Sequence, residues 1–115
     1  MQVTDTTTVL DRGQLREITL DDAELMREIL SALIDDTSRQ IVLLETAIRD
    51  GDSQQCMRLA HYSKGACANV GANAAAAVLK QMERQAGEGQ FPECVASLAA
   101  LTHQIDRLRD EVTSF

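Results

Sequence analysis

Apolar residues recur every three or four positions across one long stretch of this chain, and that spacing constrains the fold more than any other feature. The stripe consists of Leu25, Met26, Ile29, Leu30, Leu33, Ile34, Ile41, Leu44 and Ile48. Side chains at this spacing share one face of an α-helix. The stripe continues to about Asp50, so it predicts a helix of roughly thirty residues and about 45 Å.

The start of this helix carries a recognisable signal. Thr19 is followed three residues later by Asp22, which resembles a weakened capping box opening the helix. The stripe is polar at residues 35–37, so we expect a bend there.

Glycines mark the ends of the following segments. Gly51 is expected to end the long helix, and Asp52 or Ser53 to cap the next one. That second helix runs to about Val70, where Gly71 is placed to end it in a left-handed conformation.

Further helices are expected on both sides of these two. A short one spans residues 10–18, with Asp11 as its cap and with Leu15 and Ile18 on one side. Another spans residues 73–86, and a loop follows at residues 87–90. The last helix begins near Pro92, a residue favoured in a first turn. Its inward residues are predicted to be Val95, Leu98, Leu101, Ile105, Leu108 and Val112.

Composition agrees with a helical fold, because aromatic residues make up only 3% and there is one proline. Four amphipathic helices with short loops predict an all-α fold, namely an antiparallel up-down four-helix bundle with a short extra N-terminal helix. Residues 1–18 would form a tail and a short covering helix. Residues 19–115 would form the bundle as a single domain.

Several classes of protein are excluded by the same sequence. It has no apolar run long enough to cross a membrane and no basic-then-apolar leader, so we expect a cytoplasmic protein. Cys56, Cys67 and Cys94 form no Cys-x-x-Cys pair and are expected to be reduced, buried thiols. No residues have zinc-ligand spacing, so neither a metal nor a cofactor is expected.

The charges are unevenly distributed along the sequence, and this distribution is more informative than the net charge. The net charge is −7, which argues against nucleic-acid binding. Residues 53–82 nevertheless contain no acid and three cations, Arg58, Lys64 and Lys80, so this window carries +3 and the remainder −10. A locally basic face on an acidic body suits a site that holds a phosphoryl group and meets an acidic partner pocket.

One histidine lies inside this basic window. On a helical wheel His61 points away from the side that a bundle would bury. The opposite, inward side carries Cys56, Leu59, Ser63, Ala66, Cys67 and Val70. The face around His61 carries two cations, a thioether and small residues, namely Met57, Arg58, Lys64, Gly65, Ala68 and Ala72. The imidazole is therefore expected on an accessible, shallow surface.

The pattern of His61, Lys64-Gly65, small residues at 66–69 and Val70-Gly71 resembles the histidine-containing phosphotransfer (HPt) domain of two-component relays. The resemblance runs from about Leu20 to the C-terminus. It includes Met82-Glu83, which matches a hydrophobic-Glu pair common on the next helix of the family. Ser63 departs from the family, which usually has an apolar residue there. We expect its hydroxyl to bond back to the carbonyl of Leu59 or Ala60.

This resemblance implies a phosphocarrier that passes a phosphoryl group between response-regulator receiver domains, including that of a hybrid histidine kinase. Nε2 of His61 would be the acceptor, Lys64 would stabilise the phosphoryl group, and Gly65 would let the partner approach. Met57, Arg58, Ala68 and Ala72 would form the docking patch. The receiver would bring Mg²⁺, and the chain would act as a monomer and not as a kinase, since it has no ATP-binding motif.

Other readings remain open at this point. The chain could be a non-catalytic helical adaptor that binds a receiver domain without being phosphorylated, and His61 could be an ordinary surface histidine. His103 has no partner at ligand spacing and is expected to be solvated. A Cys-His nucleophile fails, because Cys67 points about 120° away from His61 on the wheel.

Overall fold

The computed structural model describes residues 8–115, which fold into helices without any strand in that range. The helices are α1 (Arg12–Thr19), α2 (Ala23–Arg49), α3 (Ser53–Val70), α4 (Asn73–Gly87) and α5 (Phe91–Val112). The all-α prediction is confirmed. Residues 1–7, which belong to the expected N-terminal tail, lie outside the described residues. Within residues 8–115, no helix is both long and apolar enough to cross a membrane.

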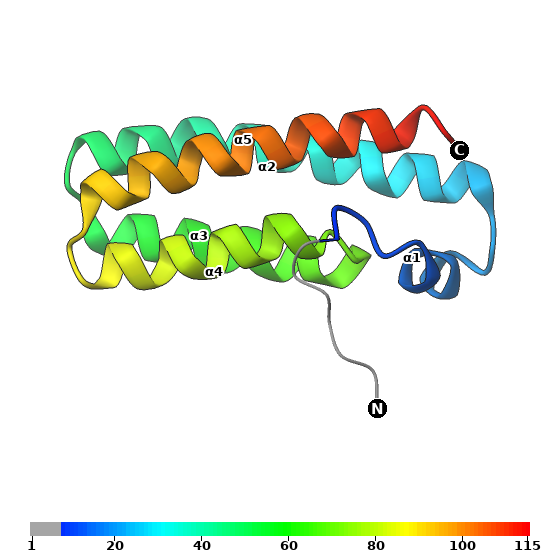
Figure 1. The fold of residues 1–115 in the computed structure, drawn as a ribbon, viewed down its shortest axis with the longest axis horizontal. Helices are drawn as coiled ribbons and strands as arrows, with labels where there is room; N and C mark the ends of the chain where they lie inside the picture. Colours follow the sequence, from blue (N-terminus) through cyan, green and yellow to red (C-terminus); the bar gives the residue numbers. More distant parts are fainter. Residues whose placement is uncertain (1–7) are drawn as a thin grey trace.

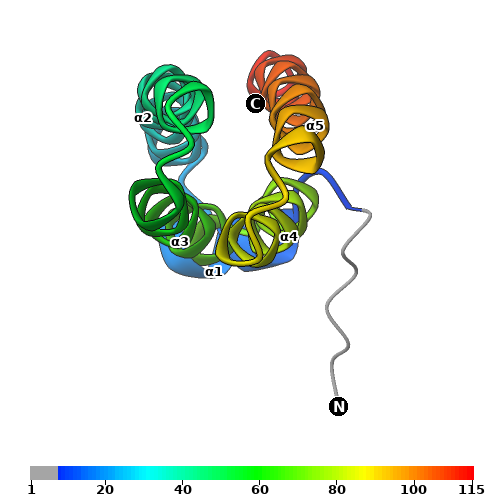
Figure 2. The same ribbon diagram turned by 90° about the vertical axis from the view of Figure 1, so that its left-hand side faces the viewer.

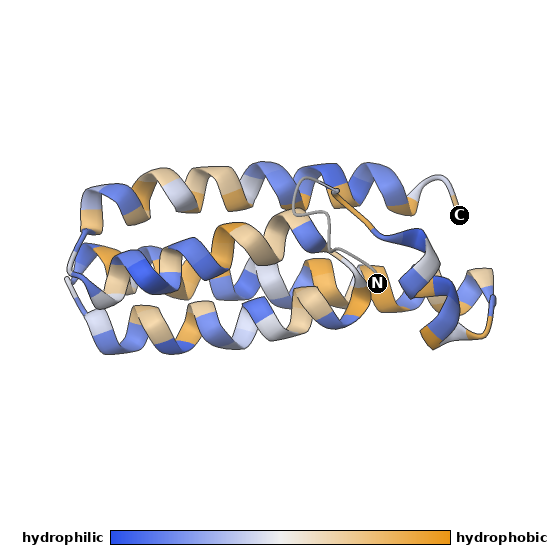
Figure 3. Ribbon diagram, turned by 60° about the horizontal axis from the view of Figure 1, so that its bottom comes forward, coloured by the Kyte–Doolittle hydropathy of each residue, from blue (hydrophilic) through white to orange (hydrophobic). Residues whose placement is uncertain are grey.

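The four long helices lie side by side, and short turns reverse the chain between them (Figure 1). Viewed along the long axis, they occupy the corners of a square in the order α2, α3, α4, α5 (Figure 2). Each helix contacts its two neighbours in this order, and α1 packs on α2 and α3 at one end. Hydrophobic and hydrophilic residues alternate along each helix, as amphipathic helices require (Figure 3).

Aspartates cap three of the five helices. The side chains of Asp11 and Asp52 accept hydrogen bonds of 3.1 Å from backbone N–H groups three residues on, as predicted. Asp22 does the same for Leu25 at 3.2 Å and begins α2. The predicted capping box was therefore wrong in its first member, because Thr19 is the last residue of α1. The helix α2 then continues without a break through residues 35–37.

The inward face of α1 also differs from its prediction. Thr19 is buried and its hydroxyl donates to the carbonyl of Leu15 at 2.7 Å, whereas Ile18 is about half exposed. An internally bonded threonine hydroxyl can be buried at low cost, so the helix places Thr19 inside in place of Ile18.

The segment before α1, and α1 itself, contact the turn between α3 and α4. The backbone N–H of Asp11 donates to the carbonyl of Gly71 at 2.8 Å, and that of Ala74 donates to the carbonyl of Thr8 at 2.9 Å. The side chain of Gln14 donates to the carbonyls of Ala68 and Asn69 at 2.8 and 3.1 Å. These bonds supply hydrogen-bond partners at the C-terminus of α3 and the N-terminus of α4, where the helices leave backbone groups exposed.

The inward face of α5 is shifted from the predicted one. Val95 is 57% exposed, so its predicted core position was wrong, and Cys94 and Ser97 are buried instead. Leu101, Ile105 and Leu108 are buried as predicted. The small Cys and Ser side chains fit where α5 approaches α4, and Ser97 donates to the buried Gln85 side chain at 2.8 Å.

All three cysteines are buried free thiols, as predicted. Burial raises the pKa of Cys56 to about 12 and that of Cys67 to about 11, so neither forms a thiolate near neutral pH. Cys56 lies on α3 and Cys94 on α5, and no Cα of one helix is within 8 Å of a Cα of the other. A disulfide between them would require backbone movement.

The hydroxyl of Ser63 is buried and has no hydrogen-bond partner among residues 8–115, which corrects the predicted bond to Leu59 or Ala60. The inward direction of Ser63 on α3 is as predicted. A buried hydroxyl without a partner lowers stability by its full desolvation free energy.

We expect Ser63→Ala to raise the free energy of unfolding by about 1 kcal/mol, since it removes an unsatisfied polar group and only one heavy atom. Urea denaturation followed by circular dichroism measures the change. Ser97→Ala is the matched control, because it deletes a buried hydroxyl that does donate a bond and should lower stability by about 1 kcal/mol. Equal losses for the two variants would contradict the argument.

Candidate functional site

His61 lies at the middle of α3 on its outer side. Its side chain is 70% exposed, which confirms that it points away from the core. The capped start of α3 at Asp52 and its left-handed end at Gly71, where φ is +86°, fix the length and phase of the helix. Because that phase buries Leu59, Ala60 and Ser63, it turns the histidine outward.

A carboxylate on α4 contacts the histidine. Oε2 of Glu83 is 3.2 Å from Nδ1 of His61, and its Oε1 accepts a hydrogen bond of 2.8 Å from Nζ of Lys64. One carboxylate thus joins the histidine to the lysine one turn further along α3. Sequence reasoning missed this role: Met82-Glu83 matched a family pattern, but nothing in the sequence alone placed Glu83 beside His61.

The charge state of Glu83 decides which ring nitrogen carries the proton. The hydrogen bond from Lys64 is the main cause that lowers the pKa of Glu83, and the bond with His61 lowers it further. The carboxylate is therefore ionised at neutral pH and can only accept hydrogen bonds. Nδ1 of the neutral ring must then carry its proton, which leaves the lone pair on Nε2.

Gly65 opens the surface beside the histidine. A side chain added at this position would meet nothing within 4 Å, so the packing of this chain does not require glycine there. The residue leaves a bare stretch of helix next to His61, accessible to an approaching molecule.

The predicted docking residues divide into two groups. Met57, Arg58 and Ala68 are exposed on α3, on the side that carries His61. Ala72 is completely buried, so its predicted place on this surface was wrong. The helical wheel extended α3 too far, since the chain turns at Gly71 and Ala72 becomes the cap of α4.

The α2 side of the histidine carries a second polar contact. The hydroxyl of Tyr62 donates to Asp36 at 3.0 Å, and Asp36 also pairs with Arg39 at 3.5 Å. The Asp36 carboxylate thus places negative charge on the surface at the flank of α3 that faces α2.

Other candidates have no comparable surroundings. His103 is exposed on α5, as predicted, and makes no side-chain hydrogen bond with the described residues. Within residues 8–115, no cluster of three or more His, Cys, Asp or Glu side chains could hold a metal ion.

We expect the contribution of Glu83 to stability to depend on pH. Because its pKa is lower in the folded chain, the stabilisation is present above the ordinary carboxyl pKa and is lost as pH falls through the lowered value. The difference in Tm between the native chain and Glu83→Gln should therefore shrink as pH falls from 7 to 3, measured by thermal denaturation. A difference that stays constant over this range would contradict the assignment.

The family model described as the Hpt domain matches residues 28–111. The crystal structure of histidine-containing phosphotransfer protein B from Pseudomonas aeruginosa PAO1 superposes with a TM-score of 0.84 at 23% identity and covers 92% of both chains. This second likeness concerns the fold. No curated protein matches the sequence significantly.

Proposed function

Because the chain belongs to the HPt family of two-component signalling phosphotransfer proteins, we propose that His61 relays a phosphoryl group between two receiver domains. His61 would accept the group from an aspartyl phosphate on one receiver and yield it to an aspartate on another. The observation that carries the proposal is a 70% exposed histidine whose Nδ1 lies 3.2 Å from an ionised carboxylate and whose Nε2 makes no hydrogen bond with the described residues.

The transfer step follows from the state of the ring. The Nε2 lone pair attacks the phosphorus of the aspartyl phosphate, a nitrogen–phosphorus bond forms, and the phosphorus–oxygen bond to the aspartate breaks. The receiver carboxylate leaves with the electron pair of that bond. Nδ1 keeps its proton throughout, so no separate base is needed. The reverse sequence delivers the group to the next receiver.

Glu83 has two tasks in this step. Its bond with Nδ1 fixes the ring orientation and the tautomer, as a carboxylate does for the histidine of a catalytic triad. It also faces the positive charge that the ring gains as Nε2 bonds to phosphorus, and so stabilises the phosphorylated ring.

Lys64 supplies positive charge beside the same ring. Its Nζ is held by Glu83 within one helical turn of His61, and its side chain is about 29% exposed. A phosphorylated imidazole carries up to about two negative charges, which a cation one helical turn away screens. The lysine thereby lowers the free energy of the phosphorylated state.

The surface around the histidine would receive the partner. Gly65 admits close approach to the backbone, and Met57, Arg58 and Ala68 offer an apolar and basic rim. The receiver would bring the Mg²⁺ and most of the catalytic groups, so the chain would act as a carrier and not as a kinase. We propose that it does so as a monomer.

A labelling experiment tests the proposal. The chain is incubated with a panel of receiver domains phosphorylated with ³²P, and the modified residue is mapped by mass spectrometry under alkaline conditions. We expect an acid-labile phosphate on His61 and its transfer to a second receiver. Binding of a receiver without any phosphate on the chain would support the adaptor reading and overturn the relay.

A further inference from the structure

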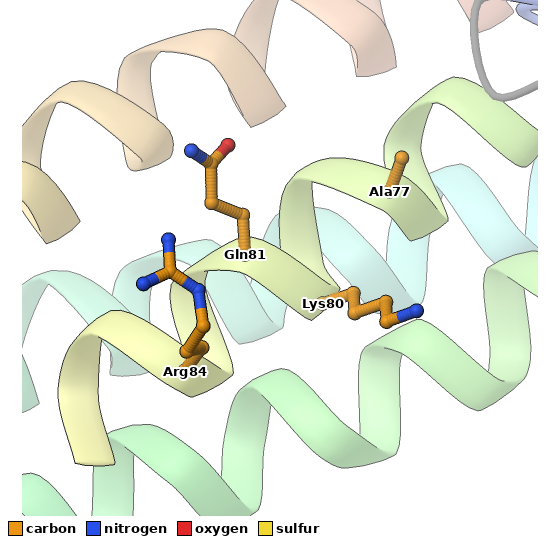
Figure 4. A pocket seen from close by; sticks show the side chains of 4 residues that line it. All are labelled: Ala77, Lys80, Gln81 and Arg84. Atoms are coloured by element: carbon orange, nitrogen blue, oxygen red, sulfur yellow. The ribbon is translucent and has the colours of Figure 1, made fainter. Parts of the chain in front are cut away.

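A hollow of about 310 Å³ lies on the outer face of α4, beyond the residues assigned to the relay site. It is lined by Ala77, Lys80, Gln81 and Arg84, which follow one another along α4 (Figure 4). The surface of the hollow is mostly apolar, since the short alanine exposes the stems of its longer neighbours. The volume is at the lower end for small-molecule pockets, which suits a side chain of a partner better than a cofactor.

The two cations at the rim are available for a partner. Among residues 8–115, Lys80 takes part in no ion pair, and Arg84 pairs only with Glu88 at 3.5 Å. Both members of that pair are at least half exposed, so the pair contributes little to stability and can exchange partners.

The hollow adjoins the histidine along α4. Lys80 lies one turn before Glu83, and Ala77 lies six residues before it, or about 9 Å along the helix axis. A standard interface buries about 800 Å² on each partner, so its footprint is about 30 Å across. A partner centred on His61 is therefore wide enough to reach along α4 to the hollow.

The surface charge favours docking of an acidic partner on the α4 side of His61 over docking on the α2 side. On the α2 flank the partner meets Asp36 and Arg39, whose charges offset each other at 3.5 Å. On the α4 flank it meets two cations, and Lys80 takes part in no ion pair among the described residues. The nearest acid on the α4 side, Glu83, is already bonded to Lys64 and His61. An acidic partner surface is thus drawn toward α4.

We propose that this hollow is a specificity site for the receiver domain, taking up an apolar side chain that carboxylates on the receiver flank. The inference rests on the proposed relay function. Lys80 and Arg84 would pair with those carboxylates, and Ala77 would contact the apolar side chain. Pairs at the rim of an interface act mainly on the association rate and on its salt dependence.

The test measures transfer from a phosphorylated receiver as a function of receiver concentration. We expect Lys80→Glu combined with Arg84→Glu to raise the KM for the receiver about tenfold with little change in kcat, and to weaken the dependence of KM on salt. Ala77→Leu, which fills the hollow without changing charge, should also raise KM. Circular dichroism confirms that each variant is folded.

The matched control is Arg27→Glu combined with Arg49→Glu on α2, which does not contact α4. Arg27, like Lys80, has no ion pair among the described residues, and Arg49, like Arg84, pairs with a glutamate four residues away. Both double variants lower the net charge by the same amount. If the hollow is a docking site, only the Lys80 and Arg84 double variant should raise the KM for the receiver. Ala99→Leu, on the exposed face of α5, is the control for Ala77→Leu.

Labelling of His61 by phosphoramidate, a small donor that needs no docking, separates this inference from the relay itself. We expect all variants to be labelled at the native rate. If transfer from the receiver occurs but neither Ala77→Leu nor the Lys80 and Arg84 reversals change KM, the hollow is not a docking site and the inference is overturned. If no receiver labels the native chain, the relay proposal fails instead.

Discussion

Phosphate transfer from a labelled receiver to the chain should become undetectable in the His61→Gln variant, a fall of more than about a thousandfold. The glutamine side chain has no ring nitrogen that could form the nitrogen–phosphorus bond. Because His61 is exposed, the free energy of unfolding should change by no more than about 0.5 kcal/mol. Transfer is measured by autoradiography, and stability by urea denaturation of the same preparations.

The chain provides its own control for this substitution. His103→Gln removes the other histidine, which is exposed on α5 and makes no side-chain hydrogen bond with the described residues. This variant should accept phosphate at the native rate. Undiminished transfer by His61→Gln, or an equal loss in both variants, would refute the assignment of His61 as the acceptor.

The helices were predictable because their signals are local. The apolar stripe of α2, the aspartate caps and the glycine at the end of α3 each depend on residues within a few positions of one another. The exposure of His61 follows from the phase of one helix and could be predicted in the same way. Periodicity predicts the inward face less well where small residues can be buried. In α5 it pointed to Val95, but the smaller Cys94 is the inward residue.

Only part of the site was predictable. His61 and Lys64 lie on α3, whereas Glu83 comes from α4. Glu83 is 22 residues from His61, and their contact depends on how α3 and α4 align after the turn at Gly71. No local pattern encodes that alignment. The same turn removed Ala72 from the expected surface, since a helical wheel assumes that the helix continues.

The unpaired hydroxyl of Ser63 shows a different limit. A helical wheel gives the direction of a side chain but not the rotamer that decides whether its oxygen reaches a carbonyl. The presence of Ser63 inside α3 could thus be predicted, and the absence of a partner could not.

Gly71→Ala should lower the free energy of unfolding by about 3 kcal/mol, or roughly 10–20 °C in Tm. Two effects add. The φ of +86° is unfavourable for any residue with a Cβ, which accounts for about 1 kcal/mol. The added Cβ would also lie 2.9 Å from the carbonyl oxygen of Asp11 and 3.1 Å from its Cβ. Thermal denaturation followed by circular dichroism measures the loss.

Gly51→Ala separates the two effects, because Gly51 has a φ of +64° and a Cβ there would meet nothing within 4 Å. This control should lose only about 1 kcal/mol. The remaining 2 kcal/mol or so in Gly71→Ala would come from pushing away the segment whose Asp11 N–H bonds to the carbonyl of Gly71. Equal losses at the two glycines would show that this segment yields freely, and that its contact with the α3–α4 turn contributes little to stability.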